Sequence, residues 1–213
     1  MIELNESLSN SKSWQKTVTV AITGASGAQY GLRLIECLLT QGHQVYLMVS
    51  KAAHIVISTE TDIKLPGQAA KLENFLLAHF KAKPGQIKVF GKEDWMSPVA
   101  SGSGAPSQMV ICPCSTGTLS AVATGASNNL IERAADVALK ERRQLILVPR
   151  ETPYSEIHLE HMLKLTRMGA VILPASPGFY HRPEDISAMV DFIVARILDQ
   201  LGLDQQLMPR WGE

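Results

Sequence analysis

The stretch TVTVAITGASGAQYG, residues 17–31, runs from β-branched residues directly into a cluster of small ones. Its first seven residues are apolar or β-branched, which predicts a strand buried on both faces of a sheet. Gly24 and Gly27 supply a turn, and helical spacing continues from there to Thr40. A strand, a glycine turn and a helix in this order predict the first unit of a doubly wound α/β fold.

Four later segments repeat the buried-strand pattern, namely QVYLMVS, QMVICPC, QLILVP and AVILP. Helical spacing between them predicts helices over residues 28–40, 68–79, 115–124, 130–142, 155–168 and 183–201. We therefore expect a single α/β domain with a mostly parallel sheet in a three-layer sandwich, either Rossmann-like or flavodoxin-like. The expected domain spans residues 17–202, between a flexible N-terminal tail (1–16) and a C-terminal tail (203–213).

Composition excludes several classes of function. The chain of 213 residues carries 20 basic and 20 acidic side chains, so it has no chain-wide basic field for nucleic acid or an anionic membrane. No apolar run approaches the ~20 residues of a spanning helix, and the first sixteen residues lack the pattern of a targeting segment. We therefore expect a cytoplasmic protein. Cys37, Cys112 and Cys114 match neither a disulfide framework nor a C-x-x-C pair, which favours small buried hydrophobic residues.

The glycine turn predicts a seat for a phosphate, because such a turn offers backbone N–H groups at the positive end of a helix. Its spacing is not the dinucleotide G-x-G-x-x-G, and the second strand ends in Val49, Ser50 and Lys51 without an acidic residue for a ribose. No tyrosine has a lysine four residues on, which argues against a short-chain dehydrogenase. A mononucleotide such as FMN fits better, and a tight turn without a ligand is the alternative.

A second hydroxyl-rich helix start occurs in CPCSTGTLSA, where Ser115, Thr116 and Thr118 follow a buried strand. Ser115 taken alone is as well explained as a helix N-cap. Two such strand ends in one sheet, with Ser50 ending a third, favour a pocket for a phosphate and a ring.

Charged residues lie where they could take part in chemistry. Arg133 and Lys140 are seven residues apart, hence on one helix face, where they form either a phosphate clamp or a solvated face with an Asp136–Lys140 pair. Arg150 and Glu151 directly follow a buried strand, the position at which ligands bind in this fold. After the last strand, Tyr180 offers a phenol, while His181 is more simply structural. No metal-binding or Walker motif occurs, so we expect no metal.

The motifs ITGASGAQYG, MVSKAA, ETD, SGS, CSTGTLSAVATG, RAADVALKERR, PRETP and GFYHRP resemble those of UbiX-type flavin prenyltransferases. The resemblance spans about residues 18–201, with eight separated motifs in the correct order. It places the chain in the homo-oligomeric flavin-containing superfamily, which also holds cysteine decarboxylases. It implies a dodecamer of flavodoxin-like or Rossmann-like subunits, once described as aromatic acid or 3-octaprenyl-4-hydroxybenzoate decarboxylases.

The resemblance also implies a reaction, in which the dimethylallyl group of dimethylallyl monophosphate is joined to N5 and C6 of reduced FMN with release of phosphate. The product, prenylated FMN, would serve a UbiD-type decarboxylase in ubiquinone or aromatic acid metabolism. The residues that it implies at the FMN site are Gly24, Ala25, Ser26, Ser50, Ser115, Thr116, Gly117, Thr118 and Arg150. The residues that it implies for catalysis or the prenyl phosphate are Ser26, Glu60, Arg133, Lys140, Glu151, Tyr180 and Arg196, some of them from neighbouring subunits.

Two other functions remain open from sequence. A cysteine decarboxylase of the same superfamily would carry a P-x-M-N-type motif, which this chain lacks. A flavodoxin-like electron carrier would have no use for Glu151, for Tyr180 or for the basic side chains of Arg133 and Lys140 on one helix face. Arg196 would pass for a surface residue without the resemblance. Trp211 in the tail either closes over the site or docks between subunits.

Overall fold

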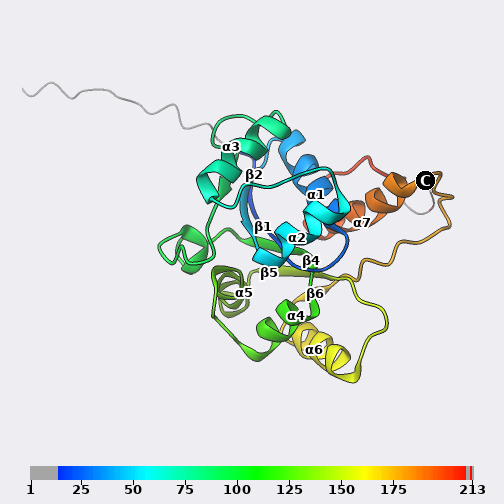
Figure 1. The fold of residues 1–213 in the computed structure, drawn as a ribbon. Helices are drawn as coiled ribbons and strands as arrows, with labels where there is room; N and C mark the ends of the chain where they lie inside the picture. The colour runs from blue at the N-terminus through cyan, green and yellow to red at the C-terminus, as the bar shows by residue number, and fades with distance from the viewer. Residues whose placement is uncertain (1–13, 210–211, 213) are drawn as a thin grey trace, which may run out of the picture.

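Six parallel strands form one sheet in the order β3-β2-β1-β4-β5-β6 (Figure 1). The computed structural model describes residues 14–209 and 212. This is the Rossmann-type order, which decides between the two doubly wound orders that the sequence left open, and the predicted α/β class is confirmed. The strands are β1 (Thr17–Ile22), β2 (Gln44–Val49), β3 (Ile87–Val89), β4 (Gln108–Cys114), β5 (Gln144–Pro149) and β6 (Val171–Ile172).

Helices cover both faces of the sheet and make the predicted three layers (Figure 1). One core cluster lies between the sheet and α1 (Ala28–Thr40), α2 (Lys51–Glu60), α3 (Ala69–His79) and α7 (Ile186–Gln200). The other lies under α4 (Thr116–Thr124), α5 (Leu130–Lys140) and α6 (Glu156–Arg167), and a 3₁₀ turn (Pro98–Ala100) interrupts the glycine- and serine-rich loop before β4.

The helices predicted from spacing are all present, with shifted ends. The α5 helix stops at Lys140 instead of residue 142, because Arg142 adopts a left-handed backbone with φ of 55°. The α7 helix begins only at Ile186, where the Asp185 side chain accepts a hydrogen bond from Ala188 N at 2.8 Å. Two elements were not predicted: the three-residue β3, and α2, which buries only Ala53 and Ile57.

The first helix lies very close to β4. A Cβ atom at Gly31 would lie 2.4 Å from the carbonyl oxygen of Cys112, so glycine is required for this approach. Cys112 and Cys114 are fully buried and Cys37 is 8% exposed, and all three are free, as predicted. Burial raises the pKa of the Cys37 thiol to about 11, which keeps it protonated at neutral pH. Among the helices of the described chain, none is long and apolar enough to cross a bilayer.

The structure describes the two ends of the chain only in part. Residues 1–13, within the predicted flexible tail, and Trp211 lie outside the described residues. The C-terminal segment after α7 turns back over α1, where the Gln41 amide donates to the Asp204 carbonyl at 2.8 Å and Leu203 packs on the core. The boundaries 1–16, 17–202 and 203–213 stay a prediction.

Candidate active site

The strand order reverses between β1 and β4, and a doubly wound sheet binds its ligands at this switch point. One buried hydroxyl joins the two loops there. The Thr23 hydroxyl donates to the Pro113 carbonyl at 2.9 Å and accepts from the Ser115 amide at 2.8 Å. Thr23 is 1% exposed, so the two loops are held as one unit beneath the surface.

The loop after β1 also approaches the start of α2. A Cβ atom at Gly24 would lie 2.5 Å from Cβ of Ala52, so the loop passes this helix without room for a side chain. Ser50 caps α2 by accepting a hydrogen bond from Ala53 N at 3.1 Å. The predicted residues Gly24, Ala25, Ser26 and Ser50 therefore meet at one edge of the sheet.

Glu60, at the end of α2, lies on the N-terminus of α1. Its carboxylate accepts hydrogen bonds at 2.9 Å from both Gly27 N and Ala28 N. This corrects the prediction that the glycine turn offers these amides to a phosphate, because an internal carboxylate already satisfies two of them. Glu60 is 33 residues away from Gly27 in the chain, so the local pattern of the turn gave no sign of this contact.

Arg150 approaches the same loop, with its Nε donating to the carbonyl oxygen of Ser26 at 3.1 Å. Burial by itself would raise the pKa of the Glu60 carboxyl. Hydrogen bonds from Ser26 and from the Ala28 and Gly27 amides, with the charge of Arg150, outweigh it and lower that pKa below its ordinary value. Glu60 is therefore ionised at neutral pH, next to the Ser26 hydroxyl.

Two phenols near Arg150 were not predicted as site residues. Burial raises the pKa of Tyr30, and the charge of Arg150 opposes the rise. Burial also raises the pKa of Tyr154, where Glu151 adds to the rise and Arg150 opposes it. Both phenols stay protonated at neutral pH and can donate hydrogen bonds. A signal existed for both, because Tyr154 directly follows PRETP and Tyr30 lies within the motif ITGASGAQYG. The approach of Tyr30 to Arg150 depends on the packing of α1.

The predicted turn after β4 begins α4. Ser115 is its N-cap, since its hydroxyl accepts from Thr118 N at 3.2 Å and lies 3.0 Å from the Thr118 hydroxyl. The cap that the sequence offered as an alternative is thus real. In the described chain no hydrogen bond uses the amides of Thr116 or Gly117, so these two N–H groups face outward from the first turn of α4.

Arg133 and Lys140 share α5 but are held by different partners. Arg133 donates to the Ala100 carbonyl at 3.1 Å and pairs with Asp136 at 2.9 Å. Lys140 pairs with Glu141. The alternative of an Asp136–Lys140 pair was wrong, because Arg133 reaches Asp136 from one turn earlier. Both cations remain partly exposed, at 34% and 45% of their side chains.

Tyr180 and Arg196 lie on the last segment of the fold. Tyr180 belongs to the loop between β6 and α7, and Arg196 pairs with Asp199 on α7 at 2.6 Å. In the described part of the chain, no hydrogen bond or ion pair joins Arg133, Lys140 or Arg196 to Ser26, Glu60 or Arg150. Within one chain, the predicted phosphate cations are therefore engaged with partners of their own and make no direct polar contact with these three residues.

Comparison with known proteins identifies the family of the chain. A family profile described as Flavoprotein matches residues 6–198. Flavin prenyltransferase UbiX of Pseudomonas aeruginosa is 64% identical over 196 residues, which cover 92% of this chain and 94% of that protein. The chain belongs to the UbiX flavin prenyltransferase family.

Solved structures of the UbiX family share the fold. AnUbiX (PadA1), in complex with FMN and dimethylallyl pyrophosphate, has a TM-score of 0.82 and 40% identity, covering 93% of this chain and 98% of that one. A dodecameric FMN-dependent UbiX-like decarboxylase from Escherichia coli O157:H7 has a TM-score of 0.80 and 38% identity, covering 92% of this chain and all of that one. The recognition made from the eight sequence motifs is confirmed.

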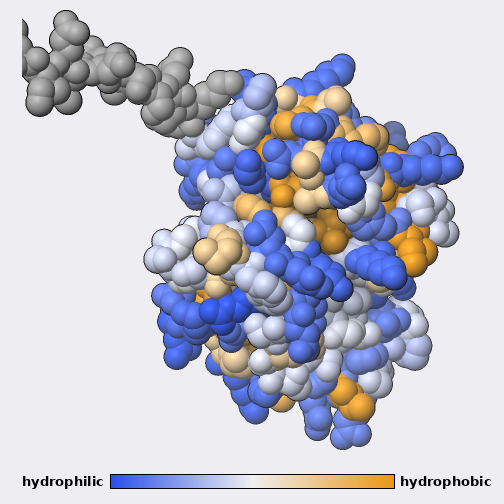
Figure 2. Space-filling view, turned by 60° about the vertical axis from the view of Figure 1, so that its left-hand side comes forward, coloured by the Kyte–Doolittle hydropathy of each residue, from blue (hydrophilic) through white to orange (hydrophobic). Residues whose placement is uncertain are grey.

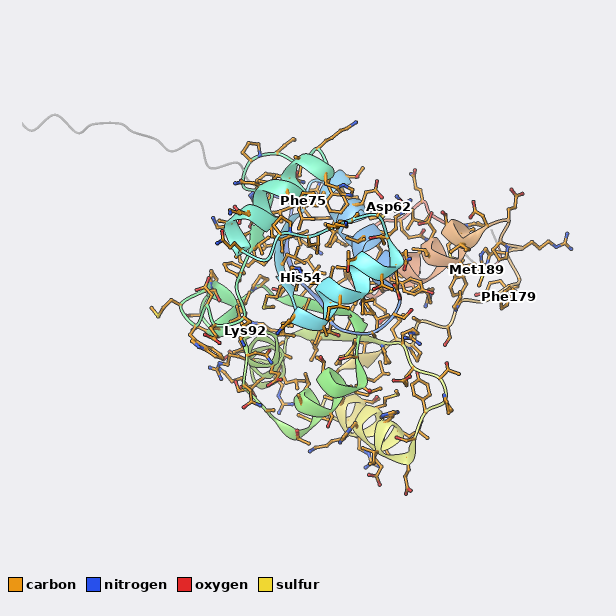
Figure 3. All side chains as sticks on the ribbon, viewed as in Figure 1. His54, Asp62, Phe75, Lys92, Phe179 and Met189 are labelled. Atoms are coloured by element: carbon orange, nitrogen blue, oxygen red, sulfur yellow. The ribbon has the colours of Figure 1, made fainter. Side chains whose placement is uncertain are left out.

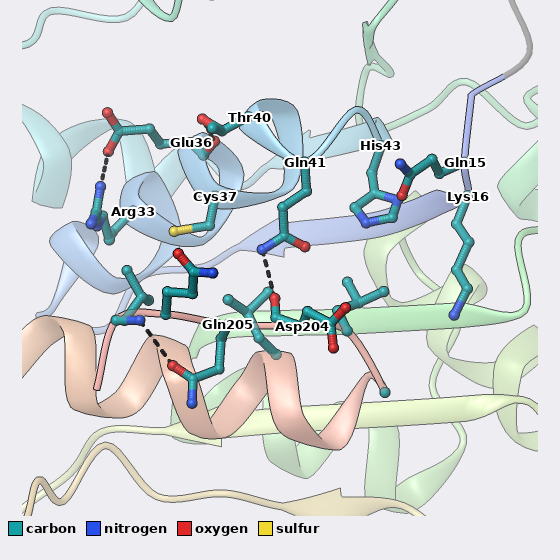
Figure 4. A pocket seen from close by; sticks show the side chains of 15 residues that line it. Gln15, Lys16, Arg33, Glu36, Cys37, Thr40, Gln41, His43, Asp204 and Gln205 are labelled. Atoms are coloured by element: carbon teal, nitrogen blue, oxygen red, sulfur yellow. Dashed lines mark hydrogen bonds and ion pairs between the residues drawn. The ribbon is translucent and has the colours of Figure 1, made fainter. Parts of the chain in front are cut away.

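A cavity of about 760 Å³ in this UbiX-family chain lies at the amino edge of the sheet, opposite the candidate site (Figure 4). Residues before β1, the end of α1 and the C-terminal segment line it, among them Lys16, His43 and Gln205. Its position away from the carboxyl ends of the strands separates it from the residues predicted to bind flavin. Among residues 14–209, no group of three or more His, Cys, Asp or Glu side chains is arranged to hold a metal ion.

Proposed function

We propose that this chain joins the dimethylallyl group of dimethylallyl monophosphate to N5 and C6 of reduced FMN, releases phosphate, and supplies prenylated FMN to a UbiD-type decarboxylase. The observation that supports this most is the edge of the sheet where Glu60, Ser26 and Arg150 meet the Ser115 turn. Membership of the UbiX family gives this arrangement its reaction.

The residues at this edge suit FMN. Gly24 leaves backbone without a side chain at the switch point, and the outward amides of Thr116 and Gly117 are donors for an anion. Ser26 and Ser50 add hydroxyls, and we assign Gly24, Ala25, Ser26, Ser50, the turn from Ser115 through Thr116 and Gly117 to Thr118, and Arg150 to FMN. Reduced FMN supplies the nucleophile.

The chain's own residues would then handle charge and protons. When the allylic C–O bond breaks, phosphate leaves with the bonding electron pair, and fixed cations and donors stabilise that charge. We assign proton movement beside the flavin to Ser26, Glu60 and Glu151, because Glu60 accepts a hydrogen bond from Ser26 and Glu151 directly follows Arg150, which donates to the Ser26 carbonyl. The groups that we assign to the phosphate are Arg133, Lys140, Tyr180 and Arg196.

Self-association is part of the proposal, because the phosphate cations pair locally within one chain and make no polar contact with Ser26, Glu60 or Arg150 in the described residues. We propose a homo-oligomer, on the pattern of the dodecameric E. coli relative, in which copies bring phosphate cations to each other's flavin sites. Large apolar side chains reach the surface in separate places: Leu159 and Leu163 on α6 are 53% and 51% exposed, and Met96 is 95% exposed. Figure 2 likewise shows apolar side chains at several surface positions with hydrophilic ones between them. The proposal retains the cytoplasmic location expected from the sequence.

The direct test incubates the protein anaerobically with reduced FMN and either dimethylallyl monophosphate or the pyrophosphate, followed by mass spectrometry of the flavin. We expect a gain of one five-carbon unit with the monophosphate. Unaltered flavin mass with both donors rejects the transferase, and a gain with the pyrophosphate alone corrects the donor. Restored turnover of a cofactor-free UbiD-type decarboxylase by the product tests the recipient.

A second test concerns the proton path. We expect Glu151→Gln to bind FMN as tightly as the unchanged protein and to lose turnover, because the amide keeps the shape and cannot carry a proton. Single-turnover measurements across a pH series check this. Undiminished turnover would remove Glu151 from the proposed path.

A further inference from the structure

Three rings pack together behind the loop that carries Tyr180. The Tyr180 ring meets the Phe192 ring edge-on at 5.9 Å between centroids, and the His181 ring stacks on Phe192 at 5.2 Å. Tyr180 and His181 also meet edge-on at 6.1 Å. Phe192, from α7, is 8% exposed and belongs to the main core, so the loop is packed on a rigid support.

Gly178 closes this packing from the backbone side. A Cβ atom there would lie 2.9 Å from Cε1 of Tyr180 and 3.2 Å from Cζ of Phe192. The backbone of Gly178 therefore lies directly against both rings, and glycine is required for lack of space. The adjacent ring of Phe179 is 69% exposed and lies at the outside of the molecule, beside the start of α7 (Figure 3).

His181 contributes to this cluster through the packing of its ring and not through hydrogen bonds of its nitrogens in the described chain. Both of its nitrogens are buried, and neither has a hydrogen-bond partner in the described chain. A group in that position can pack against a neighbour but cannot reach a ligand in this arrangement. Tyr180, in contrast, is 61% exposed, so the cluster holds one face of its ring and leaves the rest accessible.

We infer that Phe192 and Gly178 are positioning residues for Tyr180, fixing its phenol where it meets the prenyl phosphate. This rests on the proposed function, which assigns Tyr180 to that phosphate. The loop joins a two-residue strand to α7, and its backbone is held by Ala175 N donating to the Pro149 carbonyl at 3.0 Å and by Arg182 N donating to the Phe179 carbonyl at 2.9 Å. These bonds fix the backbone around Tyr180, whereas the ring contacts act on its side chain. Packing against Phe192 and Gly178 restricts the Tyr180 side chain before the substrate binds. Less conformational entropy of that side chain is therefore lost on binding.

The experiment uses the full-length protein loaded with oxidised FMN, in which no turnover occurs, and titrates dimethylallyl monophosphate by calorimetry. We expect Phe192→Leu and Gly178→Ala each to raise the dissociation constant on the order of fivefold, with FMN affinity unchanged. The first removes the ring faces, and the second pushes Tyr180 off its seat. Ile197→Val, a change at a fully buried position more than one turn later on the same helix, is the matched control and should leave the constant unchanged.

A double-mutant cycle separates positioning from general damage. If Phe192 acts through Tyr180, then adding Phe192→Leu to Tyr180→Ala raises the dissociation constant no further. An equal rise in both backgrounds overturns the positioning role while leaving the proposed function of Tyr180 intact. No effect of Tyr180→Ala alone refutes the phosphate role, and the positioning role with it. Should Phe192→Leu fail to fold, the same cycle with Gly178→Ala decides the matter by the same outcomes.

Discussion

The loops after β1 and β4 are joined through the Thr23 hydroxyl, whereas the predicted phosphate cations on α5 and α7 pair with carboxylates close to them in sequence. The first region is fixed by backbone contacts between elements far apart in the chain. The second consists of side chains that the fold presents at the surface without bringing them together. The difference agrees with the proposal that one chain builds the flavin site and that other copies complete the phosphate site.

The strongest way to break the first region is Gly31→Ala. The new Cβ would meet the Cys112 carbonyl at 2.4 Å, and neither the helix nor the central strand can give way. We expect a loss of about 3 kcal/mol in the free energy of unfolding, together with weakened FMN binding. Urea unfolding and flavin titration check this. Gly67→Ala, where nothing lies within 4 Å, should stay within about 0.5 kcal/mol of the unchanged protein.

The proposal that the second region is completed by another copy is tested by the pair Leu159→Glu and Leu163→Glu, on the exposed face of α6. A leucine buried in a subunit contact contributes about 2 kcal/mol, so charges here should split the assembly into smaller species. Sedimentation velocity measures the change. We expect turnover to fall with assembly while the unfolding free energy of the subunit changes little. The exposed Lys71→Glu is the control. An intact oligomer in the double variant would show that Leu159 and Leu163 do not lie in a contact between copies.

A smaller effect on the free energy of unfolding is expected from Glu60→Gln. This variant tests the carboxylate that links α2 to α1 in the first region. Loss of the charge at the N-terminus of α1 should cost about 0.5–1 kcal/mol at pH 7, because the group is partly exposed. The folded-state pKa lies below the ordinary value of 4.5, so this stabilisation is present above that value and is lost as the pH falls through the folded pKa. The free energy of unfolding should therefore be lower for Glu60→Gln than for the unchanged protein at pH 7, and this gap between the two proteins should close at acid pH. A gap of constant size would contradict the role of the charge, and the exposed Asp62→Asn serves as control.

The smallest expected effect belongs to Asp136→Asn on α5. Its ion pair with Arg133 is about one-third exposed, so stability should change by at most about 0.5 kcal/mol. The released positive charge should lower KM for dimethylallyl monophosphate by about twofold, in contrast to Arg133→Ala, which should raise it. Steady-state kinetics at low ionic strength measure both. A KM that rises in Asp136→Asn would show that the pair orients Arg133.

The sequence predicted most of the first region because its signals are local. Apolar runs mark buried strands, and TGASG and CSTG mark the turns that follow two of them. The parallel sheet then brings these turns together without further information. Strand order was left open between two arrangements, since three-residue β3 is too short to carry a pattern and its place beside β2 depends on tertiary pairing.

What the sequence did not predict depends on contacts between distant residues. The carboxylate of Glu60 takes the amides of Gly27 and Ala28 only because α2 returns along the switch point. Tyr30 approaches Arg150 through the packing of α1 on the sheet. The partner of Asp136 was wrong because an (i, i+3) arginine competes with an (i, i+4) lysine, and spacing alone does not rank them.

The Thr23 hydroxyl ties the two halves of the doubly wound sheet at the point where they diverge. Anyone transplanting the β4 turn into another scaffold to create a nucleotide pocket would have to carry this threonine from a loop 90 residues earlier. The sheet's two halves are thus not interchangeable modules, and chimaeras cut between β1 and β4 should preserve the threonine and its proline carbonyl together.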